Sequence, residues 1–425
     1  MKSKIISLLI IMVLSPIALF SQSKADIRHQ KQVDELMGKL SVKQKVAQLF
    51  IITISRNPSE KTKAFQDSLV REYGVGSIII MRGPIAQFIE RVNHLQSISE
   101  IPLLEMTDAE WGANMRFAEY PAYPRQALLA RIEDNPEKFL YKMGKNVAKE
   151  LKDLNIYVNL APVADVCPDP YNKADGQRSF CGDPEVVANL STAYMKGMQD
   201  NGIYACGKHY PGHGDTYVDS HYEKPIINHT VEQLYSQDLY PYDKMFANNL
   251  AMVMVGHFSY PVIDSTGTPM SISENCVKGL LRGKQGFKGV IMTDAVTMDG
   301  LAKGKDPIDI NTAVYKAGSD MILMPDEPMK AIEAIADSVS RGIYSMEELD
   351  AKVRKVLTVK ANAGFFDKGY SPIVKDLDKK IARATRRDNR LIRKMQKAMA
   401  KSSKPEITPL GQDRTLILDN QGNKK

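Results

Sequence analysis

Histidine, cysteine and tryptophan are scarce in this sequence of 425 residues, which contains 7 His, 4 Cys and 1 Trp. The cysteines, Cys167, Cys181, Cys206 and Cys276, are too few and too widely spaced for a dense disulfide framework or a cysteine-based metal motif. Cys167 and Cys181 flank one segment, where they are either paired or free. No Gly-x-Gly-x-x-Gly turn follows the first expected strand, which argues against a dinucleotide-binding sheet.

Long apolar runs are also absent except at the N-terminus. Met1–Lys4 is basic, Ile5–Phe20 is almost wholly apolar, and Ser21–Ser23 is small and polar. This order is typical of a secretory signal, so we expect residues 1–21 to be a signal peptide, with a membrane anchor as the alternative. A lipoprotein signal would require a cysteine directly after the apolar run, and the sequence has none there. We therefore expect an exported protein, periplasmic or extracellular, without a membrane span after cleavage.

The formal net charge of +7 is concentrated near the C-terminus. Residues 368–425 contain 16 Lys+Arg and 6 Asp+Glu, a net +10, so the rest of the chain contains 41 and 44, a net −3. The nearly neutral main body gives no reason to expect a nucleic-acid partner. We expect the basic segment to be a solvated, partly helical extension. Contact with an anionic envelope surface or with nucleic acid is the alternative.

Short apolar runs alternate along the chain with longer segments of helical periodicity. Continuous apolar strands that are each followed by a helix are typical of a parallel sheet buried on both faces. Eight such units over about 320 residues predict an α/β (β/α)₈ TIM-like barrel, with a doubly wound open sheet as the alternative. The expected strands are 46–54, 76–81, 102–108, 157–166, 203–209, 251–257, 289–294 and 320–325.

Three segments follow from this pattern. We expect a signal peptide over residues 1–21, a catalytic barrel over 22–367, and a short basic C-terminal extension over 368–425. The extension contains a helical pattern at 379–399 and is interpreted as a helical and irregular tail, or as the remnant of a second domain.

Polar side chains gather where the expected strands end, which is the edge of a (β/α)₈ barrel that carries its active residues. Six polar groups converging on one edge are difficult to explain by packing. These groups are Asp108 and Glu110 after the third strand, Lys208 and His209 at the fifth, His257 at the sixth and Asp294 at the seventh, while Arg178 lies in the long segment after the fourth.

A histidine-rich loop follows the fifth expected strand. Its glycines and proline disfavour a helix, and 3 of the 7 histidines fall within residues 208–221. Asp219 and His221 are two residues apart, so in an extended loop the carboxylate can orient the imidazole for proton transfer near neutral pH. A metal site is the competing interpretation, with the ligands His209, His213, Asp215, Asp219 and His221.

Each strand-end residue also has an ordinary structural interpretation. Asp294 ends a buried apolar strand, where its carboxylate either caps a helix or is used in chemistry. Asp108 suits the binding of substrate hydroxyl groups, and the only tryptophan, Trp111, either stacks on substrate or lies in the core. Lys208 and His209 are hydrogen-bond donors for a hydroxyl-rich substrate. Arg178 is able to hold hydroxyls or a carboxylate, or to form a salt bridge.

The loop sequence resembles that of a known family. Residues 208–216 are Lys-His-Tyr-Pro-Gly-His-Gly-Asp-Thr and residues 219–221 are Asp-Ser-His. Together with the segments 178–184, 289–294 and 317–321, this pattern resembles glycoside hydrolase family 3, specifically its bacterial β-N-acetylglucosaminidases, over residues 30–365. The segment 108–112 is Asp-Ala-Glu-Trp-Gly, where single-domain members usually carry Gln and a second Gly.

The resemblance implies a retaining glycosidase. Asp294 is then the nucleophile of a covalent glycosyl-enzyme intermediate, and His221, oriented by Asp219, is the general acid/base. No metal or organic cofactor is implied. The residues that the resemblance assigns to substrate binding are Asp108, Arg178, Lys208 and His209, with His257 and Met324 near the pocket.

The expected activity is that of an exo-β-N-acetylglucosaminidase (β-N-acetylhexosaminidase) of the peptidoglycan-recycling type. Its partners are carbohydrates, namely β-GlcNAc-terminated glycans and muropeptides. Because a histidine acid leaves no second carboxylate to repel anions, phosphorolysis is a variant of the mechanism. A β-glucosidase or a GlcNAc phosphorylase of the same family, and a non-catalytic sugar-binding barrel, are the alternatives.

Overall fold

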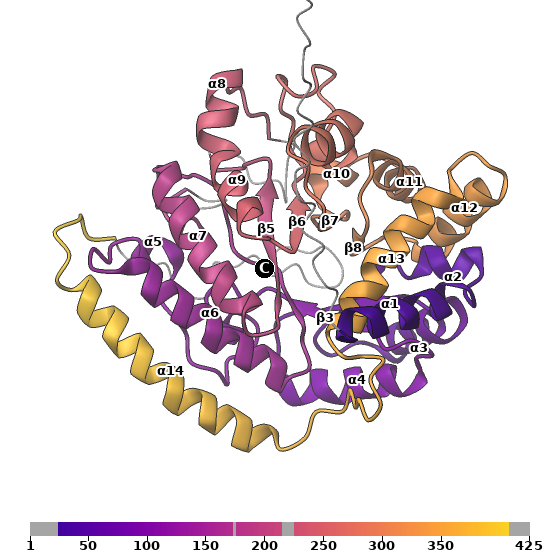
Figure 1. Cartoon of the computed structure of the whole chain (residues 1–425), viewed down its shortest axis with the longest axis horizontal. Helices are drawn as coiled ribbons and strands as arrows, with labels where there is room; N and C mark the ends of the chain where they lie inside the picture. The colour runs from indigo at the N-terminus through magenta and orange to yellow at the C-terminus, as the bar shows by residue number, and fades with distance from the viewer. Residues whose placement is uncertain (1–23, 173–175, 215–224, 408–425) are drawn as a thin grey trace, which may run out of the picture.

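Eight parallel strands lie side by side in sequence order and form one barrel (Figure 1). The computed structural model describes residues 24–172, 176–214 and 225–407. The strand order is β7-β6-β5-β4-β3-β2-β1-β8, and a parallel bridge between Met292 and Met321 joins the two ends of the sheet. The strands are β1 (Phe50–Ile54), β2 (Ser77–Ile80), β3 (Leu104–Thr107), β4 (Val158–Asn159), β5 (Tyr204–Tyr210), β6 (Met252–Val255), β7 (Val290–Thr293) and β8 (Ile322–Leu323).

Helices surround the barrel, as the alternating sequence pattern predicted. All four residues of β2, β3, β6 and β7 are buried, because side chains of one face fill the barrel and those of the other pack under helices. The main covering helices are α3 (Glu60–Ser68), α4 (Ile85–Ile98), α6 (Pro136–Asp153), α7 (Pro184–Gln199), α9 (Tyr240–Ala247), η6 (Asn275–Lys284), α11 (Pro307–Ala317), α12 (Pro328–Ser340) and α13 (Met346–Asn362). The (β/α)₈ prediction is confirmed, and the doubly wound alternative is wrong.

Short helical segments complete the connections between strands and helices. They are α1 (Lys24–Met37), α2 (Val42–Ala47), η1 (Leu69–Tyr73), η2 (Ala113–Met115), α5 (Gln126–Leu129), η3 (Gly176–Arg178), α8 (Val231–Gln233), η4 (Leu234–Asp238), η5 (Met270–Ile272) and α10 (Asp299–Ala302).

The first strand begins later than the sequence pattern predicted. The expected strand 46–54 starts inside α2, and β1 starts at Phe50. A capping box starts α2 at this point. The Ser41 hydroxyl accepts the N–H of Gln44, and the Gln44 side chain accepts the N–H of Ser41. Local capping therefore outweighs the strand preference of Val46.

The fourth strand is shorter than predicted. The expected strand 157–166 is reduced to the two residues Val158 and Asn159. Pro162 has no N–H to donate to a neighbouring strand, and beyond it only Val163 forms a bridge, with Lys208. The chain after β4 is consequently irregular.

The basic helix α14 (Leu377–Met399) lies along the outer side of α6 (Figure 1). Its buried side includes Ala384, Leu391 and Met395, and its buried Asp388 accepts the hydroxyl of Tyr123 at 2.9 Å. No helix of the described part of the chain is both long enough and apolar enough to cross a membrane.

All four cysteines are free thiols in the structure. Cys167 and Cys181 lie close together, since the N–H of Cys167 donates to the carbonyl of Cys181 at 3.1 Å, but no disulfide joins them.

Candidate active site

Two carboxylates and one ammonium group form a polar cluster at the carboxyl ends of β3 and β5. Lys208 Nζ lies 2.7 Å from Asp108 Oδ1 and 2.8 Å from Glu110 Oε1. Arg116 pairs with the other oxygen of Asp108. Glu110 is completely buried, and Lys208 is only 2% exposed. Because an ammonium group has three donors, these two contacts leave Lys208 one N–H for a substrate hydroxyl.

Arg178 contacts the same Glu110 from η3. Its Nε donates to Glu110 Oε2 at 3.1 Å, and its Nη2 donates to Oε1 at 2.8 Å. The same Nη2 lies 3.4 Å from His209 Nε2. Glu110 thus connects Arg178 and Lys208, which are two of the residues predicted to bind the sugar.

Asp165 orients His209. The Nδ1 of His209 lies 2.7 Å from Asp165 Oδ2. The backbone N–H groups of His209 and His213 donate to Asp165 Oδ1 at 3.1 Å and 2.8 Å. Since a carboxylate accepts hydrogen bonds, the proton of the ring lies on Nδ1, and Nε2 faces Arg178 and the catalytic edge.

Charge pairing keeps the central cluster ionised. Burial by itself would raise the pKa of Asp108, but Lys208 and Arg116 outweigh it and hold that pKa well below its usual range. For Glu110, burial is likewise outweighed by Arg178 and Lys208, and the pKa falls to about 2. Burial disfavours the charge on Lys208, yet Asp108 and Glu110 raise its pKa. The cluster therefore presents fixed charges that suit hydroxyl binding rather than proton transfer.

Asp294 directly follows β7 and faces this cluster. Its Oδ1 accepts the N–H of Ala295 at 2.8 Å, and its Oδ2 lies 3.9 Å from His209 Nε2. The side chain keeps 17% exposure, so the carboxylate is reachable from the barrel mouth. The next helix, α10, starts only at Asp299, so Asp294 does not cap a helix. The arrangement presents a carboxylate oxygen beside a set of hydroxyl-binding groups.

His257 lies behind Asp294. It is completely buried; its Nδ1 lies 2.7 Å from Ser271 Oγ, and its Nε2 lies 2.9 Å from the carbonyl of Ala295. A carbonyl only accepts, so Nε2 carries the proton and supports the turn after Asp294. The predicted contact of His257 with substrate stays a prediction.

Met324 follows β8 at the same end of the barrel. It is partly exposed and has a φ of 53°, which is uncommon for a residue other than glycine. Its N–H donates to the carbonyl of Ile51 at 3.0 Å, which connects this strained position to β1. The structure therefore brings Met324 to the barrel mouth, where it was predicted.

The predicted acid/base pair, Asp219 and His221, lies outside the described residues, as does Asp215 of the alternative metal site. Within the residues that the structure describes, no three His, Cys, Asp or Glu side chains are grouped to hold a metal ion. The ring of Trp111 is covered by the guanidinium of Arg125, 4.5 Å from its centroid, and is 4% exposed. This favours the core interpretation of Trp111.

Three site residues were missing from the predicted set, namely Glu110, Arg116 and Asp165. Glu110 was noted only as a polar residue near a strand end, although it is two positions after Asp108 and therefore on the same side of an extended segment. Asp165 lies in the irregular chain after β4, where no periodic signal identifies it. Glu110 and Asp165 act through residues distant in sequence, since Arg178 is 68 positions from Glu110 and His209 is 44 positions from Asp165. Arg116, in contrast, is only 8 positions from its partner Asp108.

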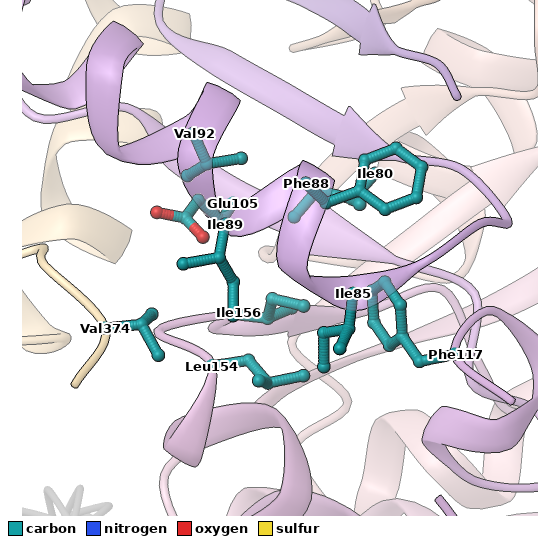
Figure 2. Close-up of a pocket in the computed structure, with 10 residues that line it drawn as sticks. All are labelled: Ile80, Ile85, Phe88, Ile89, Val92, Glu105, Phe117, Leu154, Ile156 and Val374. Atoms are coloured by element: carbon teal, nitrogen blue, oxygen red, sulfur yellow. The ribbon is translucent and has the colours of Figure 1, made fainter. Parts of the chain in front are cut away.

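A separate hollow lies between β3 and α4, away from this cluster (Figure 2). Among the ten residues that line it, only Glu105 is charged. Gln96 Nε2 donates to Glu105 Oε1 at 2.9 Å, and burial raises the pKa of Glu105 to about 8. Glu105 points outward toward the helices, so this hollow is not part of the candidate active site.

Comparison with known proteins agrees with the fold. Residues 41–359 match the model of the glycosyl hydrolase family 3 N terminal domain. Beta-hexosaminidase A of Pseudoalteromonas piscicida is 30% identical over 323 residues, which are 69% of this chain and 54% of that protein. Beta-hexosaminidase of Nitrosospira multiformis is 32% identical over 273 residues, which are 62% of this chain and 77% of that protein.

Solved structures give the same result. A family 3 beta-N-acetylglucosaminidase from Paenibacillus sp. has a TM-score of 0.74 and 30% identity, and the match covers 85% of this chain and 69% of that chain. The beta-glucoside phosphorylase BglX has a TM-score of 0.78 with 22% identity, over 89% of this chain and 68% of that chain, and shows the fold alone.

The barrel is that of the glycosyl hydrolase family 3 N terminal domain. The chain belongs to glycosyl hydrolase family 3, whose N-terminal domain model spans most of it. It spans about half the length of the Pseudoalteromonas protein that it resembles.

Proposed function

We propose that this chain is a retaining exo-β-N-acetylglucosaminidase that removes terminal β-linked N-acetylhexosamine from peptidoglycan fragments or related glycans. Similarity to proteins named beta-hexosaminidase supports the sugar class. The retaining mechanism and the glycan are parts of the proposal. So are export by a leader at residues 1–21 and action in the periplasm or outside the cell.

The observation that carries the proposal is the position of Asp294. Its Oδ2 is 3.9 Å from His209 Nε2, and His209 in turn contacts Arg178 of the polar cluster. A sugar held by its hydroxyls against this cluster has its anomeric carbon directed to the carboxylate of Asp294. Such placement converts the attack into an oriented, effectively intramolecular step.

The reaction proceeds in two displacements. In the first, an oxygen of Asp294 bonds to the anomeric carbon as the glycosidic bond breaks, and His221 gives its proton to the leaving oxygen. In the second, His221 takes a proton from water, which displaces Asp294 and releases the sugar with its original anomeric configuration. Asp219 orients His221 in both steps.

Asp108 and Lys208 hold the sugar through its hydroxyl groups. The Asp108 carboxylate accepts hydrogen bonds, and the remaining N–H of Lys208 donates one. Both groups carry charge, so their hydrogen bonds to hydroxyls are stronger than those of neutral partners. Water is the acceptor that we favour over phosphate, since Lys208, Arg116 and Arg178 are each already paired with a carboxylate.

The test is hydrolysis of 4-nitrophenyl β-N-acetylglucosaminide beside the β-glucoside, with and without phosphate, by wild type and Asp294→Ala. We expect turnover of the acetamido sugar and a loss of about 10³-fold or more in Asp294→Ala, because the covalent route is removed. Asp299→Ala, an exposed acid five residues on, is the matched control and should retain activity.

The other outcomes separate the alternatives. Faster turnover of the glucoside would identify a β-glucosidase, and a sugar phosphate formed in phosphate buffer would identify a phosphorylase. Sugar binding without turnover of either substrate would support the non-catalytic barrel. Turnover by Asp294→Ala at the wild-type rate would remove Asp294 as the nucleophile.

A further inference from the structure

The outward side of α14 carries a continuous row of cations. Arg383, Arg386, Arg390, Arg393 and Lys397 are all exposed, and they follow one another at intervals of three or four residues. This spacing places them on one side of a helix. The apolar side of the same helix is buried against the barrel, so the row faces solvent. At 1.5 Å per residue, the helix is about 35 Å long.

A second basic row lies on α6. Lys138, Lys142, Lys145 and Lys149 are exposed and follow the same three-and-four spacing. The buried residues of α6 face the barrel and α7, so these lysines also point outward. The sequence alone gives no reason to connect them with the basic C-terminal segment, which begins more than 200 residues later.

The two rows are neighbours because α14 lies antiparallel beside α6 (Figure 1). Lys380 Nζ, near the start of α14, donates to the carbonyl of Asp153 at the end of α6 at 2.8 Å. In the middle, Arg387 Nη2 donates to the carbonyl of Asn146 at 3.0 Å. After the end of α14, Ser403 donates to Glu133, just before α6, at 2.8 Å. We call the two rows together the basic face.

The exposed acids next to the basic face lie at its two ends and include Glu133, Asp134 and Asp376, which flank the two helices. Among the described residues, none of its nine cations forms an ion pair. The exposed carboxylates of the two helices are Glu137 and Asp378, each in the first turn of its own helix and therefore at opposite ends of the face. A concentration of unpaired charge of this size raises the local concentration of anions.

We propose that the basic face docks this protein on an anionic lipid bilayer. Two adjacent rows of cations form an area rather than a single track, which matches a planar sheet of phosphate headgroups. The apolar residues of both helices are used in internal packing, so the contact is electrostatic and without insertion. The predicted secretory leader would bring the chain to such a membrane.

Nucleic acid fits the face less well than lipid does. None of the large exposed apolar or aromatic side chains of the described residues lies on α6 or α14. Phe139 and Tyr141 of α6 are only partly exposed, and the Tyr141 hydroxyl is bound to Asp200, so the face offers little open aromatic surface on which a base can stack.

Docking through this face leaves the candidate active site open. Helices α6 and α14 form the side wall of the barrel, whereas Asp108, Lys208 and Asp294 lie at the carboxyl ends of the strands. The basic face and the catalytic mouth are thus separate surfaces. Membrane binding and hydrolysis of a soluble substrate are therefore separable by mutation.

The test is co-sedimentation of the full chain with vesicles of phosphatidylcholine containing about 30% phosphatidylglycerol. At low ionic strength we expect the partition coefficient to exceed that for pure phosphatidylcholine by about tenfold or more, and to fall by about tenfold between 50 and 500 mM salt. The partition coefficient on the anionic vesicles should be about tenfold lower for a variant with four substitutions on α14, namely Arg383→Gln, Arg386→Gln, Arg390→Gln and Arg393→Gln.

The matched control carries Lys61→Gln, Arg71→Gln, Lys284→Gln and Lys288→Gln, which remove the same charge from other exposed positions. It should retain partition within about threefold, and both variants should keep the unfolding temperature of wild type because every altered residue is exposed. Equal loss in both variants, equal binding to neutral vesicles, or binding to duplex DNA without binding to vesicles would overturn the proposal.

Discussion

At the residue scale, Glu110 organises the candidate site. It is the only residue that contacts both Lys208 and Arg178 among the hydrogen bonds and ion pairs described above. It touches these positioned donors rather than the proposed nucleophile Asp294, so its role is to position and to balance charge. The pKa of Glu110 near 2 shows that its negative charge is held firmly by these two cations.

Glu110→Gln should lower kcat/KM by about 10- to 100-fold, because Arg178 and Lys208 lose their common charged acceptor. The loss of one negative charge also favours ionisation of the remaining carboxylates. The acid limb of the pH profile of kcat/KM should therefore move to lower pH. The decrease in kcat/KM and the shift of the acid limb are both measured with the 4-nitrophenyl substrate from pH 4 to 8.

The control for this variant is Glu90→Gln, which alters an exposed glutamate of α4. If Glu110 had a purely structural role, Glu110→Gln would have a lower kcat/KM at every pH or a lower thermal stability. The position of its pH profile would then be that of wild type. That outcome would contradict the assignment.

At the element scale, a buried polar contact fixes α14 to the barrel. Asp388 accepts the Tyr123 hydroxyl at 2.9 Å and pairs with Arg387 at 2.7 Å. Burial, and then the neighbouring charge of Asp388, raise the pKa of Glu150 of α6 well above its ordinary value. The raised pKa of Glu150 therefore disfavours a second negative charge beside Asp388.

Asp388→Ala should release α14 from the barrel, because it leaves Tyr123 and Arg387 without their buried acceptor. The expected cost is about 2–4 kcal/mol. Limited digestion with trypsin measures it directly, since α14 is rich in Lys and Arg, and cleavage there should become at least about tenfold faster. Asp378→Ala, an exposed position on the same helix, should leave the rate unchanged. Equal cleavage of both variants would show that apolar packing alone holds the helix.

At the scale of the whole molecule, Lys360 joins the last barrel helix to the first strand. Its Nζ donates to Gln48 Oε1 at 2.8 Å, and Gln48 Nε2 donates to the carbonyl of Gly74 at 2.7 Å. Lys360 is completely buried, and this burial lowers its pKa from 10.5 to about 7. Between these two pH values the unfolded chain binds more protons than the native chain, so this residue makes stability rise with pH.

Lys360→Met should therefore stabilise the protein most below pH 7, by about 2–4 kcal/mol after the lost bond to Gln48 is counted. The difference in the free energy of unfolding between Lys360→Met and wild type should shrink as the pH rises from 7 to 10.5. Urea unfolding at pH 6 and pH 9 measures the difference from wild type. Lys368→Met, at an exposed position, should show no such dependence. A parallel pH dependence in wild type and Lys360→Met would contradict the argument.

The sequence allowed the barrel to be predicted because short, mainly apolar runs alternate with segments of helical periodicity. The prediction was wrong at the start of β1, where the capping box at Ser41 begins a helix. It was also wrong over most of 157–166, where Pro162 has no N–H to donate and only the bridge of Val163 with Lys208 follows it. Both errors arise where a single local interaction outweighs periodicity.

By itself, the sequence determined the fold class, the family and the strand-end positions of Asp108, Lys208, His209 and Asp294. Periodicity and short motifs are local properties, so they can be recognised without coordinates. Only the tertiary structure decided that Glu110 bridges Lys208 and Arg178, that Asp165 orients His209, and that the basic rows of α6 and α14 are adjacent. These facts depend on which distant segments pack together, and packing is settled by the closed barrel and not by any local stretch of residues.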